Sequence, residues 1–168
     1  MRPTGSSAAR ARLILAVPFL TLVAQAPAAR AQQAPSDLCA WLTPAQLQKT
    51  LGQQFGAPSR SAAPPAYGKK PWGTSCRYSG ANGGSLEVLF IAYVESSPTV
   101  AKATFEKLSM FYSPNTKVDG IGDEAYIDRQ GAIHVLKGKV RYFISIDTDS
   151  PARQKEVRDL ATQVAAEL

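Results

Sequence analysis

The chain has 168 residues with 19 basic side chains, 13 acidic side chains and one histidine, and its formal net charge is +6. Four of the basic residues, Arg2, Arg10, Arg12 and Arg30, lie within the first 31 residues, which hold no acidic residue. The remaining 137 residues carry 15 basic and 13 acidic side chains, so their net charge of +2 gives no reason to expect a nucleic-acid partner.

Residues 1–31 have the three parts of a cleavable secretion signal. A basic start is followed by an apolar segment over residues 13–26, which is shorter than the ~20 residues that a membrane-spanning helix needs. Cleavage after Ala31 is favoured over cleavage after Ala26, because a proline directly follows the latter. We therefore predict a periplasmic or secreted protein whose mature chain, residues 32–168, forms one domain without a transmembrane span. An uncut membrane anchor is the alternative.

Cys39 and Cys76 are the two cysteines of the chain. An even number of cysteines in an oxidising compartment favours a disulfide. A bond between them would close 37 residue steps, which the chain-entropy model values at about 4 kcal/mol. Two free thiols or half of a metal site are the alternatives. A zinc site is disfavoured by the single histidine, and no metal or other cofactor is expected.

The first predicted element of the mature chain is a short helix over residues 44–51. Thr43 can cap its free N–H groups, and the proline that follows suits the first helical position. Residues 53–74 contain several prolines and show no helical or strand period, so a surface loop is predicted. Two strands follow over residues 75–79 and 85–94, joined by an Asn-Gly turn. The second strand is apolar on both faces and is expected to be covered on both.

A second helix is predicted over residues 98–112. It is preceded by a serine that can cap it and, like the first helix, starts with a proline. Its expected apolar stripe consists of Val100, Ala101, Thr104, Phe105, Leu108 and Phe111. Three strands follow over residues 124–128, 132–136 and 140–147, and a last helix is expected to start at Ser150-Pro151. Strands joined by tight turns are antiparallel. The predicted class is therefore α+β, with a single antiparallel sheet of about five strands packed by helices in the order α-ββ-α-βββ-α.

Three short patches carry a resemblance to known proteins: residues 37–43 (DLCAWLT), residues 76–78 (CRY) and residues 118–126 (VDGIGDEAY). Together with the last strand and helix, they resemble a large group of small exported bacterial proteins, often lipoproteins, which mostly have no assigned function. That group shares a Cys-Leu-Leu-Thr…Cys-x-Trp…Gly-Leu-Gly-Asp-Glu-Ala pattern. The resemblance covers nearly all of the mature chain, and it implies an α+β sheet fold and the pairing of Cys39 with Cys76. The chain lacks the lipid-attachment cysteine, and the group offers no catalytic residue to transfer.

An acidic cluster consists of Asp119, Asp123, Glu124 and Asp128. Carboxylates beside glycines can bind Ca²⁺, which takes six to eight oxygen ligands. The alternating ligand spacing and the distal glutamate of a calcium loop are absent here. We therefore interpret the glycines of this segment as turn residues on the way into a strand, and we predict no metal site.

His134 lies in a predicted strand, on the face opposite Ile133 and Val135. A general base needs a nucleophile or substrate within hydrogen-bonding reach and usually an orienting partner. The chain has no Gly-x-Ser-x-Gly, Ser-x-x-Lys or His-Glu-x-x-His motif. We interpret His134 as a solvent-facing or hydrogen-bonded strand residue, and no catalytic residue is predicted.

Tyr67, Lys69, Lys70 and Trp72 place aromatic rings beside cations in the predicted loop. Such a surface favours contact with a protein partner or an anionic glycan, whereas the alternative is that Trp72 packs back on the core. We predict a non-enzymatic binding or accessory domain of the bacterial envelope, whose partner is an envelope protein or a glycan. A hydrolase-like enzyme that uses His134 and a nearby carboxylate is the first alternative, and a purely structural envelope component is the second.

Overall fold

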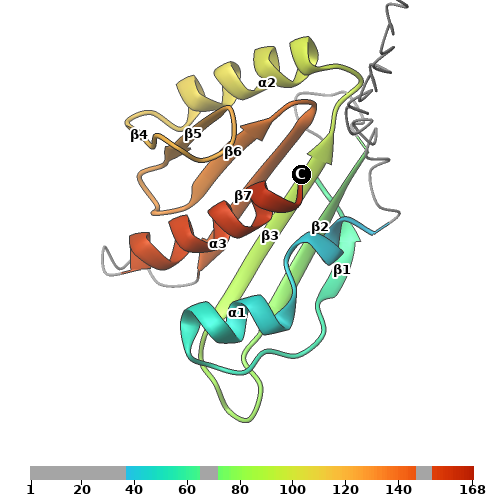
Figure 1. The fold of residues 1–168 in the computed structure, drawn as a ribbon, viewed down its shortest axis with the longest axis vertical. Helices are drawn as coiled ribbons and strands as arrows, with labels where there is room; N and C mark the ends of the chain where they lie inside the picture. Colours follow the sequence, from blue (N-terminus) through green and yellow to red (C-terminus); the bar gives the residue numbers. More distant parts are fainter. Residues whose placement is uncertain (1–36, 65–71, 147–152) are drawn as a thin grey trace, which may run out of the picture. The chain divides into compact units, whose positions relative to one another are not determined.

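A seven-stranded antiparallel sheet forms the centre of the part of the chain that the structure describes (Figure 1). The computed structural model describes residues 37–64, 72–146 and 153–168. The predicted secretion signal and its cleavage sites lie outside these residues. The strands are β1 (Ser59–Ala62), β2 (Trp72–Ser79), β3 (Glu87–Val94), β4 (Thr116–Lys117), β5 (Glu124–Ile127), β6 (Ile133–Lys137) and β7 (Val140–Ile146). They lie side by side in the order β1-β2-β3-β7-β6-β5-β4.

The helices are α1 (Pro44–Leu51), α2 (Pro98–Phe111) and α3 (Gln154–Glu167), preceded by a 3₁₀ turn, η1 (Leu38–Trp41). The predicted α+β class, with one antiparallel sheet and helices, is confirmed. The predicted strand number and order are wrong, because the described strands number seven and the order is α-βββ-α-ββββ-α. Among the described residues, no helix is both long enough and apolar enough to cross a bilayer.

The two strands that the sequence pattern missed lie at the edges of the sheet. All four residues of β1 are exposed, and β4 has only two residues, which are also exposed. Neither strand buries an apolar face that would produce a pattern. They exist because β1 pairs with β2 and β4 pairs with β5, so their structure comes from the neighbouring strand.

The main core lies between one face of the sheet and the helices α1 and α3 with η1 (Figure 1). The stripe of α3 that packs there contains Val157, Leu160, Ala161 and Val164. From the sheet, Tyr142 donates a 2.6 Å hydrogen bond to the carbonyl of Ala161. Burial raises the pKa of this tyrosine. Helix α3 begins at Gln154 after Arg153, which makes no side-chain capping bond, and the predicted start at residues 150–151 lies outside the described residues.

A disulfide joins Cys39 of η1 to Cys76 of β2, as predicted, with 5.8 Å between the two Cα atoms. Next to it, the fully buried Tyr78 donates hydrogen bonds to the carbonyls of Cys39 and Leu42. Burial raises the pKa of Tyr78. The disulfide and this hydroxyl together fix the start of the described chain against the second strand of the sheet.

Helix α1 begins at Pro44, as the sequence predicted. The N-cap residue Thr43 and the third helical residue, Gln46, form a complete capping box. The left-handed Gly52 ends the helix. Helix α2 likewise begins at the predicted Ser97-Pro98 pair, with the Ser97 side chain accepting from the backbone N–H of Val100.

Helix α2 packs on the opposite face of the sheet from α3. Its buried residues Ala101 and Phe105 contact Tyr126 of β5 and Leu136 of β6 in a second, smaller core. The predicted apolar stripe is therefore wrong at both ends, since Val100 is 40% exposed and Phe111 is 72% exposed. The helix is rotated so that Ala101 and Phe105 face the sheet.

The glycine-rich approach to β5 contains one glycine that cannot be replaced without moving the backbone. Gly122 has a φ of +62°, and a Cβ atom there would lie 2.5 Å from the carbonyl oxygen of Leu136. The next residue, Asp123, donates its backbone N–H to that same carbonyl at 2.8 Å. The glycine thus allows the loop to close against β6, which supports its interpretation as a turn residue.

Candidate functional site

The face of the sheet that carries α2 is only partly covered. Along β3, Val88, Phe90 and Ala92 on the main-core face are buried. Three residues on the opposite face are only half-buried: Leu89, Ile91 and Tyr93. The prediction that β3 is covered on both faces is therefore confirmed only in part. Helix α2 contacts β5 and β6 through its smaller core, so among the described residues no helix covers the β3 side of this face.

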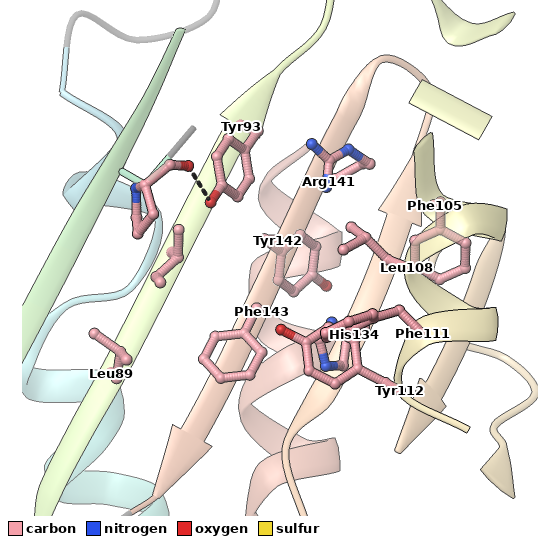
Figure 2. Close-up of a pocket in the computed structure, with 12 residues that line it drawn as sticks. Leu89, Tyr93, Phe105, Leu108, Phe111, Tyr112, His134, Arg141, Tyr142 and Phe143 are labelled. Carbon is pink, nitrogen blue, oxygen red and sulfur yellow. Dashed lines mark hydrogen bonds between the residues drawn. The ribbon is translucent and has the colours of Figure 1, made fainter. Parts of the chain in front are cut away.

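A pocket of about 380 Å³ lies where α2 meets this open half (Figure 2). Strands β3, β6 and β7 supply its floor, and the C-terminal half of α2 supplies one wall. Its described lining is mostly apolar and aromatic, and includes Pro64, Leu89, Ile91, Tyr93, Phe105, Leu108, Phe111, Tyr112, His134, Arg141, Tyr142 and Phe143. Figure 2 shows these side chains arranged between the strands and the helix.

His134 lies in this lining and is buried, with only 6% of the residue exposed. Its Nε2 atom is 2.9 Å from Oδ2 of Asp128, whose side chain has no exposed surface. The other carboxylate oxygen accepts from the backbone N–H groups of Gln130 at 2.9 Å and Ala132 at 3.0 Å. Of the two interpretations left open by the sequence, the hydrogen-bonded strand histidine is confirmed.

The pKa of Asp128 reflects two opposing effects. Burial acts to raise it, because burial penalises the charged form. The hydrogen bond and charge of His134, with the two backbone N–H groups, outweigh burial and hold the pKa below its ordinary value. Asp128 is therefore a carboxylate at neutral pH, and it is at once the turn residue between β5 and β6 and the partner of His134.

Aromatic rings surround the imidazole of His134. The ring of Tyr126 is stacked on it at 4.6 Å between centroids, with an interplanar angle of 13°. Tyr112 lies at 4.8 Å and Phe143 at 4.9 Å, both tilted. This packing from β5, α2 and β7 holds the ring in one orientation as part of the pocket wall.

A second charged pair lies at the end of the pocket nearest Tyr93. Arg141 donates to Oε1 of Glu95 from Nε at 3.0 Å and from Nη2 at 2.6 Å, and the two side chains are 4% and 9% exposed. The guanidinium lies 4.7 Å above the Tyr93 ring. Burial raises the pKa of Tyr93, although Arg141 opposes this effect, and the Tyr93 hydroxyl donates to the carbonyl of Pro64 at 3.0 Å (Figure 2).

The chemistry available in the pocket is mainly that of contact with apolar groups. None of the described residues that line it is a serine, threonine, cysteine or lysine. His134 thus has an orienting carboxylate, but the described lining places no hydroxyl, thiol or amine nucleophile of these four types beside it. Arg141 is paired with Glu95, and the rest of the described lining is a mostly hydrocarbon surface with three phenol groups and one imidazole.

The acidic cluster of the sequence is dispersed in the structure. Asp119 pairs with Lys117 at 3.4 Å, and Glu124 pairs with Lys102 at 3.0 Å. Asp123 accepts from the backbone N–H of Gly138, and Asp128 is taken up by His134. Within the described ranges, no group of three or more histidine, cysteine or acidic side chains is placed to hold a metal ion.

The predicted binding surface of the loop falls almost entirely outside the described residues. Tyr67, Lys69 and Lys70 are not among them. Trp72 opens β2, and its backbone lies opposite Val94 of β3. The prediction that Trp72 belongs to a loop is therefore wrong. The contact surface itself stays a prediction, and it is adjacent in sequence to Pro64, which lines the pocket.

The pocket itself was missed by sequence reasoning. One signal was present, namely the second apolar face of β3, but it was interpreted as a buried face. The other signal was the wide apolar surface of α2, of which only Ala101 and Phe105 are buried among the described residues. Together they indicate an apolar surface that the described elements leave partly exposed, and such a surface is typical of a binding site.

Comparison with known proteins gives no match for this chain. No protein-family model, no curated protein and no solved structure is significantly similar to it.

Proposed function

We propose that the protein is an exported, non-enzymatic binding domain, and that it binds a small apolar molecule in the pocket between α2 and the open half of the sheet. The observation that carries this proposal is the aromatic and aliphatic lining of a pocket of about 380 Å³. Its size lies near the lower end of the roughly 300–1,000 Å³ that small-molecule sites occupy. Mostly apolar walls with a few polar groups are typical of such sites.

The residues around the pocket support binding in place of catalysis. Asp128 and His134 form a hydrogen-bonded pair, but Asp128 also holds the turn between β5 and β6 through two backbone N–H groups. The pair therefore has a structural task of its own. Binding without turnover is the simpler use of a lining that offers no serine, threonine, cysteine or lysine among its described members.

Export is supported by the predicted secretion signal and by the Cys39–Cys76 disulfide, which suits an oxidising compartment. The segment that contains Tyr67, Lys69, Lys70 and Trp72 remains a proposed contact surface for an envelope protein or a glycan. Because it follows Pro64 in the chain, the same domain can carry a ligand pocket and a neighbouring partner surface.

The test is binding of N-phenyl-1-naphthylamine, an uncharged dye that fluoresces in apolar surroundings. The purified protein should give saturable, one-site fluorescence enhancement. Leu108→Trp, which adds bulk to a lining residue of α2, should weaken binding at least about tenfold. Ala103→Trp is the matched control, because Ala103 is an exposed residue of the same helix that does not line the pocket, and it should bind the dye as the wild type does.

Equal binding by both tryptophan variants would place the dye elsewhere and contradict the proposal. A stable dimer that excludes the dye, detected by light scattering, would show that a second copy of the chain covers this face. Hydrolysis of a p-nitrophenyl ester by the wild type that is lost in His134→Gln would contradict the non-enzymatic proposal.

A further inference from the structure

We infer that the pocket selects an uncharged ligand and rejects an anion of the same shape, although an arginine lines it. This inference rests on the proposed function and names the chemical class of the ligand. It follows from the way the charged side chains around the pocket are paired.

Arg141 is the one arginine of the described lining, which holds no lysine. An arginine in an apolar pocket would ordinarily suggest a carboxylate or phosphate ligand. Here Oε1 of Glu95 accepts from both Nε and Nη2 at hydrogen-bonding distance. Both side chains are more than nine-tenths buried, so the positive charge is already matched inside the protein. The ring of Tyr93 covers the guanidinium at 4.7 Å.

His134 is paired through its Nε2 atom with Asp128, whose lowered pKa keeps the carboxylate ionised. Any positive charge on the imidazole is therefore matched by a carboxylate at 2.9 Å. The two pairs together leave the described lining without an uncompensated charge.

The consequence for a ligand follows from the cost of desolvation. An anion that enters such a pocket loses its hydration and gains no unpaired cation from the described lining in return. An uncharged aromatic or aliphatic group loses little on leaving water and gains apolar contact. Side chains such as Leu89, Ile91 and Leu108 supply that contact. The ligand class is thus an uncharged, mainly hydrocarbon molecule.

The test compares two dyes with one scaffold, N-phenyl-1-naphthylamine and its sulfonated counterpart 8-anilino-1-naphthalenesulfonate. The wild type should bind the uncharged dye at least about tenfold more tightly than the sulfonate. Glu95→Gln, which leaves Arg141 unmatched, should reduce or reverse this preference. Asp159→Asn is the matched control, because it removes the same charge from the partner of the exposed Lys155 on α3 and should leave the preference unchanged.

Glu95→Gln can fail to fold, since it leaves a buried cation unpaired. The double variant Glu95→Gln/Arg141→Met removes both charges and should keep the wild-type preference for the uncharged dye. Equal binding of the two dyes by the wild type, or tighter binding of the sulfonate, would overturn this inference and leave the pocket proposal standing. Failure of the wild type to bind either dye would overturn the proposed function itself.

Discussion

At the scale of single residues, the carboxylate of Asp128 holds both a turn and the side chain of His134. Three hydrogen bonds converge on Asp128, two from the backbone of the turn and one from the imidazole. Because Asp128 is ionised, each of these hydrogen bonds is charge-assisted and therefore stronger than a hydrogen bond between neutral groups. The turn between β5 and β6 and the pocket wall at His134 are therefore linked through one side chain.

Replacing Asp128 with asparagine should change the pH dependence of stability. Because the folded-state pKa of Asp128 lies below its ordinary value, its stabilisation is fully present above an unfolded pKa of about 3.9. It is lost as the pH falls through the lowered pKa of the folded state. We expect the variant to lose about 1–3 kcal/mol at pH 7 and to show a shallower acid decline, measured by urea denaturation at several pH values.

Asp119→Asn provides the control, because its side chain is almost fully exposed beside Lys117. It should match the wild type at every pH. An acid decline in Asp128→Asn as steep as that of the wild type would show that other carboxylates dominate the titration.

At this scale, the sequence placed His134 on the correct face but could not supply its partner. Asp128 and His134 are brought together by the register of the β5–β6 hairpin, in which Tyr126 lies opposite His134 and Ile127 lies opposite Ile133. A register is set by pairing across strands, so it is not visible in either strand alone. The disulfide could be predicted, because only one pairing of two cysteines exists within one chain.

In helix α2, the residues that stabilise the fold differ from the residue that is exposed at the pocket. One face packs Phe105 against Tyr126, with 5.1 Å between ring centroids. The C-terminal end of the helix instead presents Phe111, which is 72% exposed, at the rim of the pocket. Hydrophobic periodicity predicted the helix and its bounds closely, but it could not tell a buried phenylalanine from an exposed one on a wide apolar surface.

Two alanine substitutions in α2 should therefore differ sharply. Phe105→Ala removes a ring that is 4% exposed and should cost about 3–5 kcal/mol of unfolding free energy. Phe111→Ala should change that free energy by less than about 0.5 kcal/mol while it weakens dye binding. Denaturant unfolding and dye titration measure the two effects. Similar stability losses in the two variants would mean that the end of the helix is packed in solution.

The edge strands mark where element prediction fails for a physical reason. A polar, exposed segment such as β1 has no alternation to detect, and its strand geometry comes from pairing Arg60 with Cys76. Because this segment has no apolar alternation, the sequence predicts a loop over residues 59–62, where the structure has a strand. Strands that bury a face, such as β7, could be predicted to within a residue or two.

For the whole molecule, the disulfide ties the first described residues to the sheet across 37 positions of sequence. Replacing both Cys39 and Cys76 with alanine should lower the unfolding free energy by about 4 kcal/mol, mainly through a more flexible unfolded chain. The urea m-value should rise, because the unfolded chain exposes more surface. Wild type treated with a reductant should reproduce the variant.

A loss below about 1 kcal/mol would contradict this expectation. It would mean that η1 is held by the packing of Leu38 and Leu42 and by the Tyr78 hydroxyl, with little help from the covalent bond.

The alternation along β3 has a consequence for how such a protein can diversify. Val88, Phe90 and Ala92 are buried in the main core, while the residues between them line the pocket. Substitutions at the intervening positions can change the shape of the pocket without repacking the core, because neighbouring residues of a strand face opposite sides. One strand thus holds two sets of residues, one that stabilises the fold and one that determines which ligand binds. Mutations in the second set can change ligand binding while the first set preserves the fold.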